Sequence, residues 1–415
     1  MKKKTEVKTL KRENNDWFEI LLLCLCVVAA LFIMWTFTGQ WPWKGQPYNS
    51  YILQAQSWLQ GRLDLGQNYS HLEIAIYGGK YFISFPPFPS YLMLPFVAIG
   101  WDTCDGFIAL LASLAGAVYA FLILRHFDIK GNRAVFYALF VTIASNWLFT
   151  AANAWVWFIA QNISFALSMM AIYYALKGKA GLSLSFWACA VGCRPFQALY
   201  IPVLLYIIYK KHMEENPDDK LIDIIKKKYL CLIAPFLIAL SYMILNYARF
   251  GSIVEFGHNY LPEHTSSELG QFHYSYIPHN LGSIIRIPEI NRDGIWEYPR
   301  FNGMCWFMIS PVVITYVVYL IKSVVKKIQT DKILLVLIPV LIFVQLVALS
   351  AHVQMGGSQF GNRYPTDALP LVFLGLSILL PKQQEKYEAL SAPLFIMGLC
   401  LNIVGAVGYY NGFFG

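Results

Sequence analysis

Charged residues are scarce in this chain of 415 residues, because Asp, Glu, Lys and Arg together make up only 13% of it. That is about half the share found in soluble domains, and the hydrophobic share of 57% exceeds their usual range of about 45–50%. So little charge excludes a soluble globular enzyme. The composition predicts an all-α polytopic membrane protein in which residues 1–415 form a single membrane domain.

Motifs that hold nucleotides and metals are also missing. The chain has no Gly-rich phosphate-binding loop, which excludes chemistry driven by ATP. Its eight cysteines show no CxxC spacing and lie mostly inside apolar runs, as small buried hydrophobic residues do. The four histidines of segment 249–303 follow one another at intervals of six, nine and six residues, which match no metal-site pattern. We therefore expect no metal and no cofactor.

Long apolar runs dominate the rest of the chain, and about eleven of them are candidates to cross the membrane. The first, Trp17 to Thr38, is too long for the core of a signal peptide. Basic loops alternate with loops poor in basic residues, beginning with a basic tail over 1–16, so we place the N-terminus in the cytoplasm. The cytoplasmic segments then hold 23 of the 32 Lys and Arg residues. Topology and anionic lipid thus account for the net charge of +8, and nucleic acid is excluded as a partner.

The nine basic residues on the outer side differ from those inside. Seven of them are arginine, whereas the cytoplasmic segments contain twenty lysines and three arginines. A guanidinium group binds phosphate through two parallel hydrogen bonds, so the excess favours an anionic ligand outside. Random partition and structural ion pairs would produce the same excess. Three outer segments, 39–105, 249–303 and 352–366, are long or polar enough to build a site.

The first outer loop combines a helix pattern with a hairpin pattern. In PYNSYILQAQSWLQG the apolar residues recur at helical spacing, which predicts an amphipathic helix in the membrane interface. Gly78-Gly79 then predicts a β-hairpin with these glycines as the two turn residues. In that register Glu73 and Lys80 share the polar face of the hairpin. The loop is therefore either part of a site with an acid and a base or an aromatic cap in the interface.

Two arginines lie at the outer ends of apolar runs. Arg363 follows a glycine-rich turn, and Asp367 comes four residues later, so the two can pair along one helix face. Arg194 lies at the turn of an apolar hairpin, 181–209, whose 29 residues span only ~44 Å as helix against ~60 Å for two crossings. An arginine below the membrane surface is costly unless it pairs or faces a wet cavity. Both arginines are candidates for binding phosphate, with a structural ion pair as the alternative.

The middle outer segment, 249–303, is rich in histidine and tyrosine. Such side chains stack on sugar rings and form hydrogen bonds with their hydroxyls. His258 and Tyr260 are therefore candidates for binding a sugar or an acceptor, in a segment that acts as an acceptor surface or a lid.

Taken in chain order, these segments resemble a known family. A first span, a long outer loop with YGGKYFISFPPFPSYLMLPF, a hairpin with GCRPFQALYIP, and GSQFGNRYPTDALPLVF near the end are similar to membrane glycosyltransferases of the GT-C class. The similarity is to the branch of protein mannosyltransferases and aminoarabinose transferases, and it covers most of the chain through short motifs. It implies transfer of a sugar from a polyprenyl-phosphate donor to a lipid, glycan or protein acceptor on the outer face of a bacterial cell membrane. It also implies that Lys80, Arg194 and Arg363 hold the donor phosphate.

One position departs from the family pattern. Many relatives carry an aspartate as the general base where this chain has Asn49, and an amide cannot accept the proton. Among the remaining acids of the first outer loop, Glu73 is the preferred base for an inverting transfer of a hexosyl or pentosyl group. Asp64 is the second candidate, and it can instead cap a turn.

Two other classes of protein would use the same arginines. A transporter or flippase for polyprenyl lipids also binds phosphate, but transporters have inverted repeats and broken helices at the membrane midplane. A non-catalytic subunit that only binds lipid-linked sugar needs the cations without the base. The polar residues of this chain gather on one side of the membrane, which favours the enzyme over the transporter.

Overall fold

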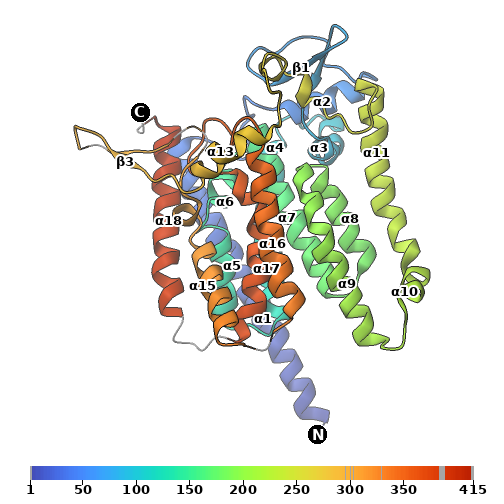
Figure 1. Ribbon diagram of the computed structural model, residues 1–415, viewed down its shortest axis with the longest axis vertical. Helices are drawn as coiled ribbons and strands as arrows, with labels where there is room; N and C mark the ends of the chain where they lie inside the picture. Colours follow the sequence, from blue (N-terminus) through green and yellow to red (C-terminus); the bar gives the residue numbers. More distant parts are fainter. Residues whose placement is uncertain are drawn as a thin grey trace.

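The protein folds as a bundle of α-helices with short helices and hairpins covering one end (Figure 1). The computed structural model describes residues 2–294, 296–299, 301, 303–328, 330–382 and 388–412. The helices of the bundle are α1 (Lys2–Thr38), α4 (Asp105–His126), α5 (Gly131–Val141), α6 (Trp147–Ala151), α7 (Val156–Leu176), α8 (Ala180–Val191), α9 (Ile201–Glu215), α11 (Ile233–Phe250), α15 (Val312–Val325), α16 (Lys332–Ser350), α17 (Leu369–Leu379) and α18 (Glu388–Tyr410). The shorter helices are α2 (Ser50–Leu59), α3 (Phe88–Ala98), α10 (Leu221–Lys228), α12 (Pro262–Thr265), α13 (Ile277–Ser283) and α14 (Trp306–Ile309), and the strands are β1 (Ile74–Tyr77), β2 (Lys80–Ile83), β3 (Glu289–Ile290) and β4 (Trp296–Glu297).

Among the residues that the structure describes, six helical segments are long and apolar enough to cross a membrane. They are Asp16–Thr38, Asp105–His126, Val156–Leu176, Leu221–Phe250, Lys332–Ser350 and Glu388–Tyr410. Four shorter apolar helices are Phe88–Ala98, Ala180–Val191, Val312–Val325 and Tyr364–Leu379. The chain is an integral membrane protein of predominantly helical fold. The count of eleven crossings and the cytoplasmic side of the N-terminus stay predictions.

Helix α7 forms the centre of the bundle. It packs against α4 and α8, and 83% of its apolar window is buried, against 17% for the segment Leu221–Phe250. Gly116 of α4 permits the close contact with α7, since a Cβ at this position would come within 2.9 Å of the Phe165 ring. The first turn of α7 is therefore held firmly at the covered end of the bundle, whereas α10 and α11 lie at its edge (Figure 1).

The helix and the hairpin expected in segment 39–105 are both present. Helix α2 packs against α3, and β1 pairs with β2 around Gly78 and Gly79, whose φ angles are +56° and +74°. The face of the hairpin that was expected to be polar is apolar at its centre, because Ala75 and Phe82 are buried against Phe250 of α11. The hairpin is therefore packed on both faces, and only its tip is exposed.

The chain bends between α8 and α9 at the predicted turn. Arg194 has an extended backbone (φ −139°, ψ 103°), and a 3₁₀ helix over Pro195–Tyr200 leads from it into α9. The middle and third segments are joined by a bridge between Phe272 and His352. Segments that are distant in sequence therefore meet at the covered end of the bundle.

Candidate functional site

A cavity of about 710 Å³ lies at the covered end of the bundle. Its lining comes from the three segments that the sequence singles out, the start of α7, the turn between α8 and α9, Leu349 of α16 and Tyr409 of α18. Among the lining residues are Tyr48, Glu73, Ser84, Trp155, Trp157, Phe158, Arg194, Glu255, His258, Glu263, His264, Phe272, His352, Gly356 and Arg363. Candidate cations and a candidate base thus face one space.

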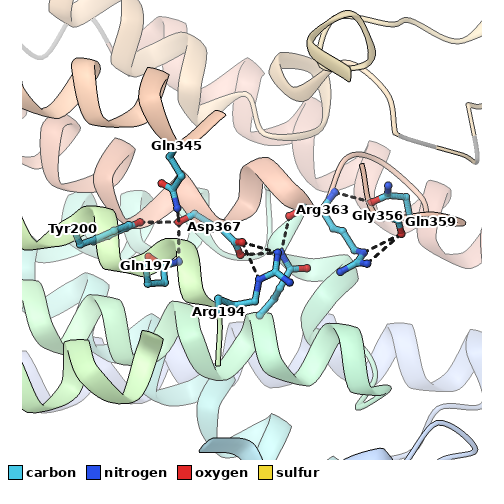
Figure 2. Close-up of polar contacts among 9 residues, drawn as sticks. Arg194, Gln197, Tyr200, Gln345, Gly356, Gln359, Arg363 and Asp367 are labelled. Carbon is cyan, nitrogen blue, oxygen red and sulfur yellow. Dashed lines mark hydrogen bonds and ion pairs between the residues drawn. The ribbon is translucent and has the colours of Figure 1, made fainter. Parts of the chain in front are cut away.

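Asp367 is the centre of a hydrogen-bond network beside this cavity (Figure 2). Its carboxylate accepts hydrogen bonds from Arg194 Nε at 2.9 Å and from Gln161 Nε2 at 2.9 Å, and Arg194 Nη2 lies 2.8 Å from the same carboxylate. Its backbone oxygen accepts from the Tyr200 hydroxyl at 2.7 Å. The predicted pair between Arg363 and Asp367 is wrong, because Asp367 lies in a 3₁₀ helix, in which residues four apart do not share a face. Arg194 therefore reaches the cavity with most of its charge already paired.

Arg363 is held without a carboxylate partner among the described residues. Its Nε and Nη2 donate to the backbone oxygen of Gly356 at 3.2 Å each, and its backbone N–H donates to Gln359 at 2.8 Å (Figure 2). Gly356 has φ +101°, and a Cβ there would lie 2.9 Å from Arg363 Nε, so glycine is needed for this approach. Within the described part of the chain, buried Nη1 has no hydrogen-bond partner. A buried cation with a free N–H is costly, and an anion in the cavity would remove that cost.

Glu73 precedes β1 and is half-buried in the lining of the same cavity. The Ser84 hydroxyl donates to its backbone oxygen at 3.1 Å, which fixes the base of the hairpin. Burial raises the pKa of the Glu73 carboxyl, Glu263 raises it further, and a hydrogen bond from the Trp157 indole and the charge of Arg363 oppose the rise. A carboxylate with a raised pKa, facing a cavity that also holds a free cation, is suited to accept a proton.

Three histidines from two segments form a cluster on the cavity wall. The ligand nitrogens of His258, His264 and His352 lie within 4.8 Å of one another. The Nδ1 atoms of His258 and His352 contact the backbone oxygens of Ser84 and Gln354, both at 2.7 Å. Burial lowers the pKa of His258 to about 4 and that of His352 to about 3, so both rings are neutral near pH 7. The sequence predicts no metal, but neutral imidazoles at this spacing could hold a divalent cation such as Zn²⁺.

An aromatic platform, defined as Tyr48, Trp155 and Trp157, forms another part of the wall. The Tyr48 ring centroid lies 4.9 Å from that of Trp155 and 5.0 Å from that of Trp157. Trp155 stacks on Phe158 at 5.8 Å. The backbone N–H of Val156 donates to the backbone oxygen of Tyr48 at 3.0 Å, which joins the first outer loop to the start of α7.

Three of the residues predicted for the site lie outside the cavity lining. Asp64 accepts a hydrogen bond from the Gly66 backbone at 3.0 Å and caps a turn. Lys80 is exposed at the tip of the hairpin. Tyr260 packs on Tyr77, with ring centroids 4.6 Å apart. The structure therefore brings together Glu73, Arg194, Arg363 and His258 and leaves these three residues apart from them.

Other lining residues were missed by reasoning from the sequence. His352 opens the third segment and joins histidines of the second, a link that no spacing reveals. Trp155 and Trp157 precede an apolar run, where tryptophan is usual at a membrane interface. Gln161 lies outside the lining but could have been found from the sequence, because an amide inside an apolar run needs a polar partner, which here is Asp367.

The fold is similar to that of ArnT, an aminoarabinose transferase of the GT-C class. The crystal structure of ArnT from Cupriavidus metallidurans bound to undecaprenyl phosphate matches with a TM-score of 0.51 and 13% sequence identity, over 94% of this chain and 75% of that chain. The apo structure of the same protein matches with a TM-score of 0.49 and 12% identity over the same shares. No family model matches the chain, and neither does any curated protein. The similarity is therefore one of fold.

Proposed function

We propose that the protein transfers a sugar from a polyprenyl-phosphate donor to an acceptor hydroxyl on the outer face of the membrane. The observation that carries the proposal is Arg363, a buried guanidinium with an N–H free among the described residues, in the same cavity as Glu73. The fold supports it, since the ArnT structure holds undecaprenyl phosphate. A cavity of about 710 Å³ has the size of a small-molecule site.

The reaction follows from the two groups. Glu73 accepts the proton of the acceptor hydroxyl while the hydroxyl oxygen forms a bond to the anomeric carbon of the sugar. The bond from that carbon to the phosphate oxygen breaks, and its electron pair leaves with the phosphate. Arg363 and the remaining N–H groups of Arg194 stabilise the charge that develops on the phosphate. Attack from the side opposite the phosphate inverts the configuration of a hexosyl or pentosyl group.

Because Arg194 is paired with Asp367, the two arginines have different roles. Arg194 has part of its charge compensated and serves mainly to orient the phosphate, whereas Arg363 supplies the uncompensated charge. A binding subunit or a transporter would need the cations and not Glu73. The carboxylate beside the cations is what favours the transferase.

The proposal is tested by donor consumption with purified protein. Undecaprenyl phosphate carrying mannose, glucose or 4-amino-4-deoxyarabinose is incubated with a cell-envelope extract as acceptor, and the donor is followed by mass spectrometry. Wild type should consume at least one donor, and Glu73→Gln should lower the rate by about 10²- to 10⁴-fold, as loss of a general base does. Glu268→Gln is the matched control, because Glu268 is exposed and lies outside the cavity lining.

The alternatives have their own outcomes. Loss of activity in Asp64→Asn with full activity in Glu73→Gln would assign the base to Asp64. Movement of the lipid across liposomes without donor consumption would identify a transporter. Donor binding with neither consumption nor movement would identify a non-catalytic subunit.

A further inference from the structure

The aromatic platform of Tyr48, Trp155 and Trp157 is not used by the chemistry described above. We propose that this platform binds the sugar ring of the donor and that it sets the preference of the cavity for sugar-bearing lipid over bare lipid phosphate. The inference rests on the proposed function, since it places the sugar next to a phosphate bound at Arg363.

The position of the platform is the first argument. It forms a continuous series of rings with the phosphate end of the cavity, because Trp155 stacks on Phe158 at 5.8 Å and the Arg363 guanidinium lies 5.8 Å from the Phe158 centroid. At its other end, Trp157 lines the cavity together with Glu73, and its indole lowers the pKa of the Glu73 carboxyl. A sugar linked to a phosphate at Arg363 would therefore lie over the platform with its anomeric carbon between the cation and the base.

The chemistry of the platform is the second argument. Sugar rings have faces of C–H groups that pack on the negative faces of aromatic rings, and Tyr and Trp combine such a face with a polar atom at the ring edge. The three rings are tilted by 47° to 75° to one another, so they form a concave wall and do not stack as a flat sheet. A concave aromatic wall suits a compact ring with hydroxyls around its edge.

The platform is also rigid. The Val156 backbone N–H donates to the backbone oxygen of Tyr48, and the Trp155 backbone N–H donates to Asn153 Oδ1 at 2.9 Å. Helix α7 behind it is the most buried of the candidate spans. A wall fixed before the ligand arrives loses little conformational entropy on binding, which makes it effective in recognition.

The test compares the affinity of purified protein for two ligands, undecaprenyl phosphate and the sugar-bearing donor that the wild type consumes or binds best. Trp155→Ala should lower the affinity for the sugar-bearing donor by roughly tenfold or more, as expected for loss of one aromatic contact. The same substitution should change the affinity for bare undecaprenyl phosphate by less than ~2-fold. Tyr48→Leu should have the same selectivity, and Tyr48→Phe, which keeps the ring, should bind the donor like wild type. Trp43→Ala is the control, because Trp43 is 67% exposed and lies outside the cavity lining.

Three results would overturn the inference. First, Trp155→Ala and Tyr48→Leu could bind the donor with the affinity of wild type. Second, both variants could lose affinity for the two ligands equally, which would mean that the rings only support the fold. Wild type could bind the sugar-bearing lipids no better than the bare lipid, which would remove the sugar site and leave the phosphate site in place. Failure of wild type to bind either ligand would instead refute the proposed function, and the platform with it.

Discussion

The two ends of the bundle hold their cations in different ways. At the end without the cavity, basic side chains pair with acids and many are exposed. These pairs are Lys210–Asp331 and Lys227–Asp219 at 2.6 Å, Arg125–Asp16 at 2.7 Å and Lys211–Glu214 at 3.1 Å. At the cavity end, Arg194 pairs with the buried Asp367, whereas buried Arg363 donates to a backbone carbonyl and has no carboxylate partner among the described residues.

This difference separates a structural use of charge from a functional one. Exposed pairs contribute little, typically about 0–1 kcal/mol, and serve topology and solubility. Burying an uncompensated guanidinium costs stability, so its retention in a cavity points to an anion that binds there. Four substitutions, at Asp367, Arg363, Trp157 and Asp331, test this contrast.

Asp367→Asn should have the largest effect on stability. It leaves the largely buried Arg194 without its carboxylate, and we expect a loss of about 3 kcal/mol in the free energy of unfolding, as for other broken buried pairs. Denaturation of the purified protein in detergent measures this loss. A loss below about 1 kcal/mol would mean that Arg194 is as weakly coupled as the pairs at the opposite end.

Arg363→Ala should reduce affinity for undecaprenyl phosphate by roughly 10- to 100-fold, since hydrogen bonds to a charged group contribute about 1.5–3 kcal/mol. Stability should not fall, because the variant removes a buried charge. Lys210→Ala, at the opposite end, is the matched control and should leave affinity unchanged. Equal affinities in wild type and Arg363→Ala would refute the assignment of the phosphate site.

Trp157→Phe should move the pH dependence of activity. The base must be ionised, so kcat/KM falls as the pH drops through the pKa of Glu73, which burial raises above its ordinary value of 4.5. The Trp157 indole lowers that pKa, so its removal should shift the acidic limb to higher pH. Trp43→Phe is the control and should leave the profile unchanged. If the acidic limb of the kcat/KM profile does not move in Trp157→Phe, a group other than Glu73 determines it.

Asp331→Asn should have the smallest effect. Asp331 pairs with Lys210, which is 46% exposed, and caps α16 through the backbone N–H groups of Ile333 and Leu334. Asparagine keeps the cap and one oxygen that can accept from the Tyr206 hydroxyl, and it loses the ion pair, so we expect a change of about 0.5 kcal/mol or less in unfolding free energy. A loss as large as that of Asp367→Asn would erase the contrast between the two ends.

The hairpin and the site show what could be predicted from the sequence. Gly78-Gly79 defines a two-residue turn, and that local rule was enough to set the register of β1 and β2. The partner of Asp367 could not be found in this way. Helical spacing pointed to Arg363, but the 3₁₀ turn directed Asp367 to Arg194, 173 residues away in sequence.

The same distinction applies to the wall of the cavity. The excess of arginine on the outer side and the three polar outer segments pointed to four residues of the cavity, because their side-chain types suit phosphate binding, proton transfer or sugar binding. These residues are Glu73, Arg194, Arg363 and His258. His352, Trp155 and Trp157 join them only through helix packing. Lys80 and Tyr260 have suitable chemistry, but the hairpin carries Lys80 away from the cavity and Tyr260 is used in packing.

The most direct test is an experimental structure of the protein with undecaprenyl phosphate bound. We expect the phosphate in the cavity that contains Glu73, within hydrogen-bond distance of the Arg363 guanidinium and on the side of Arg194 away from Asp367. A phosphate bound at the lysine-rich end, or bound in the cavity without contact to Arg363, would contradict the account.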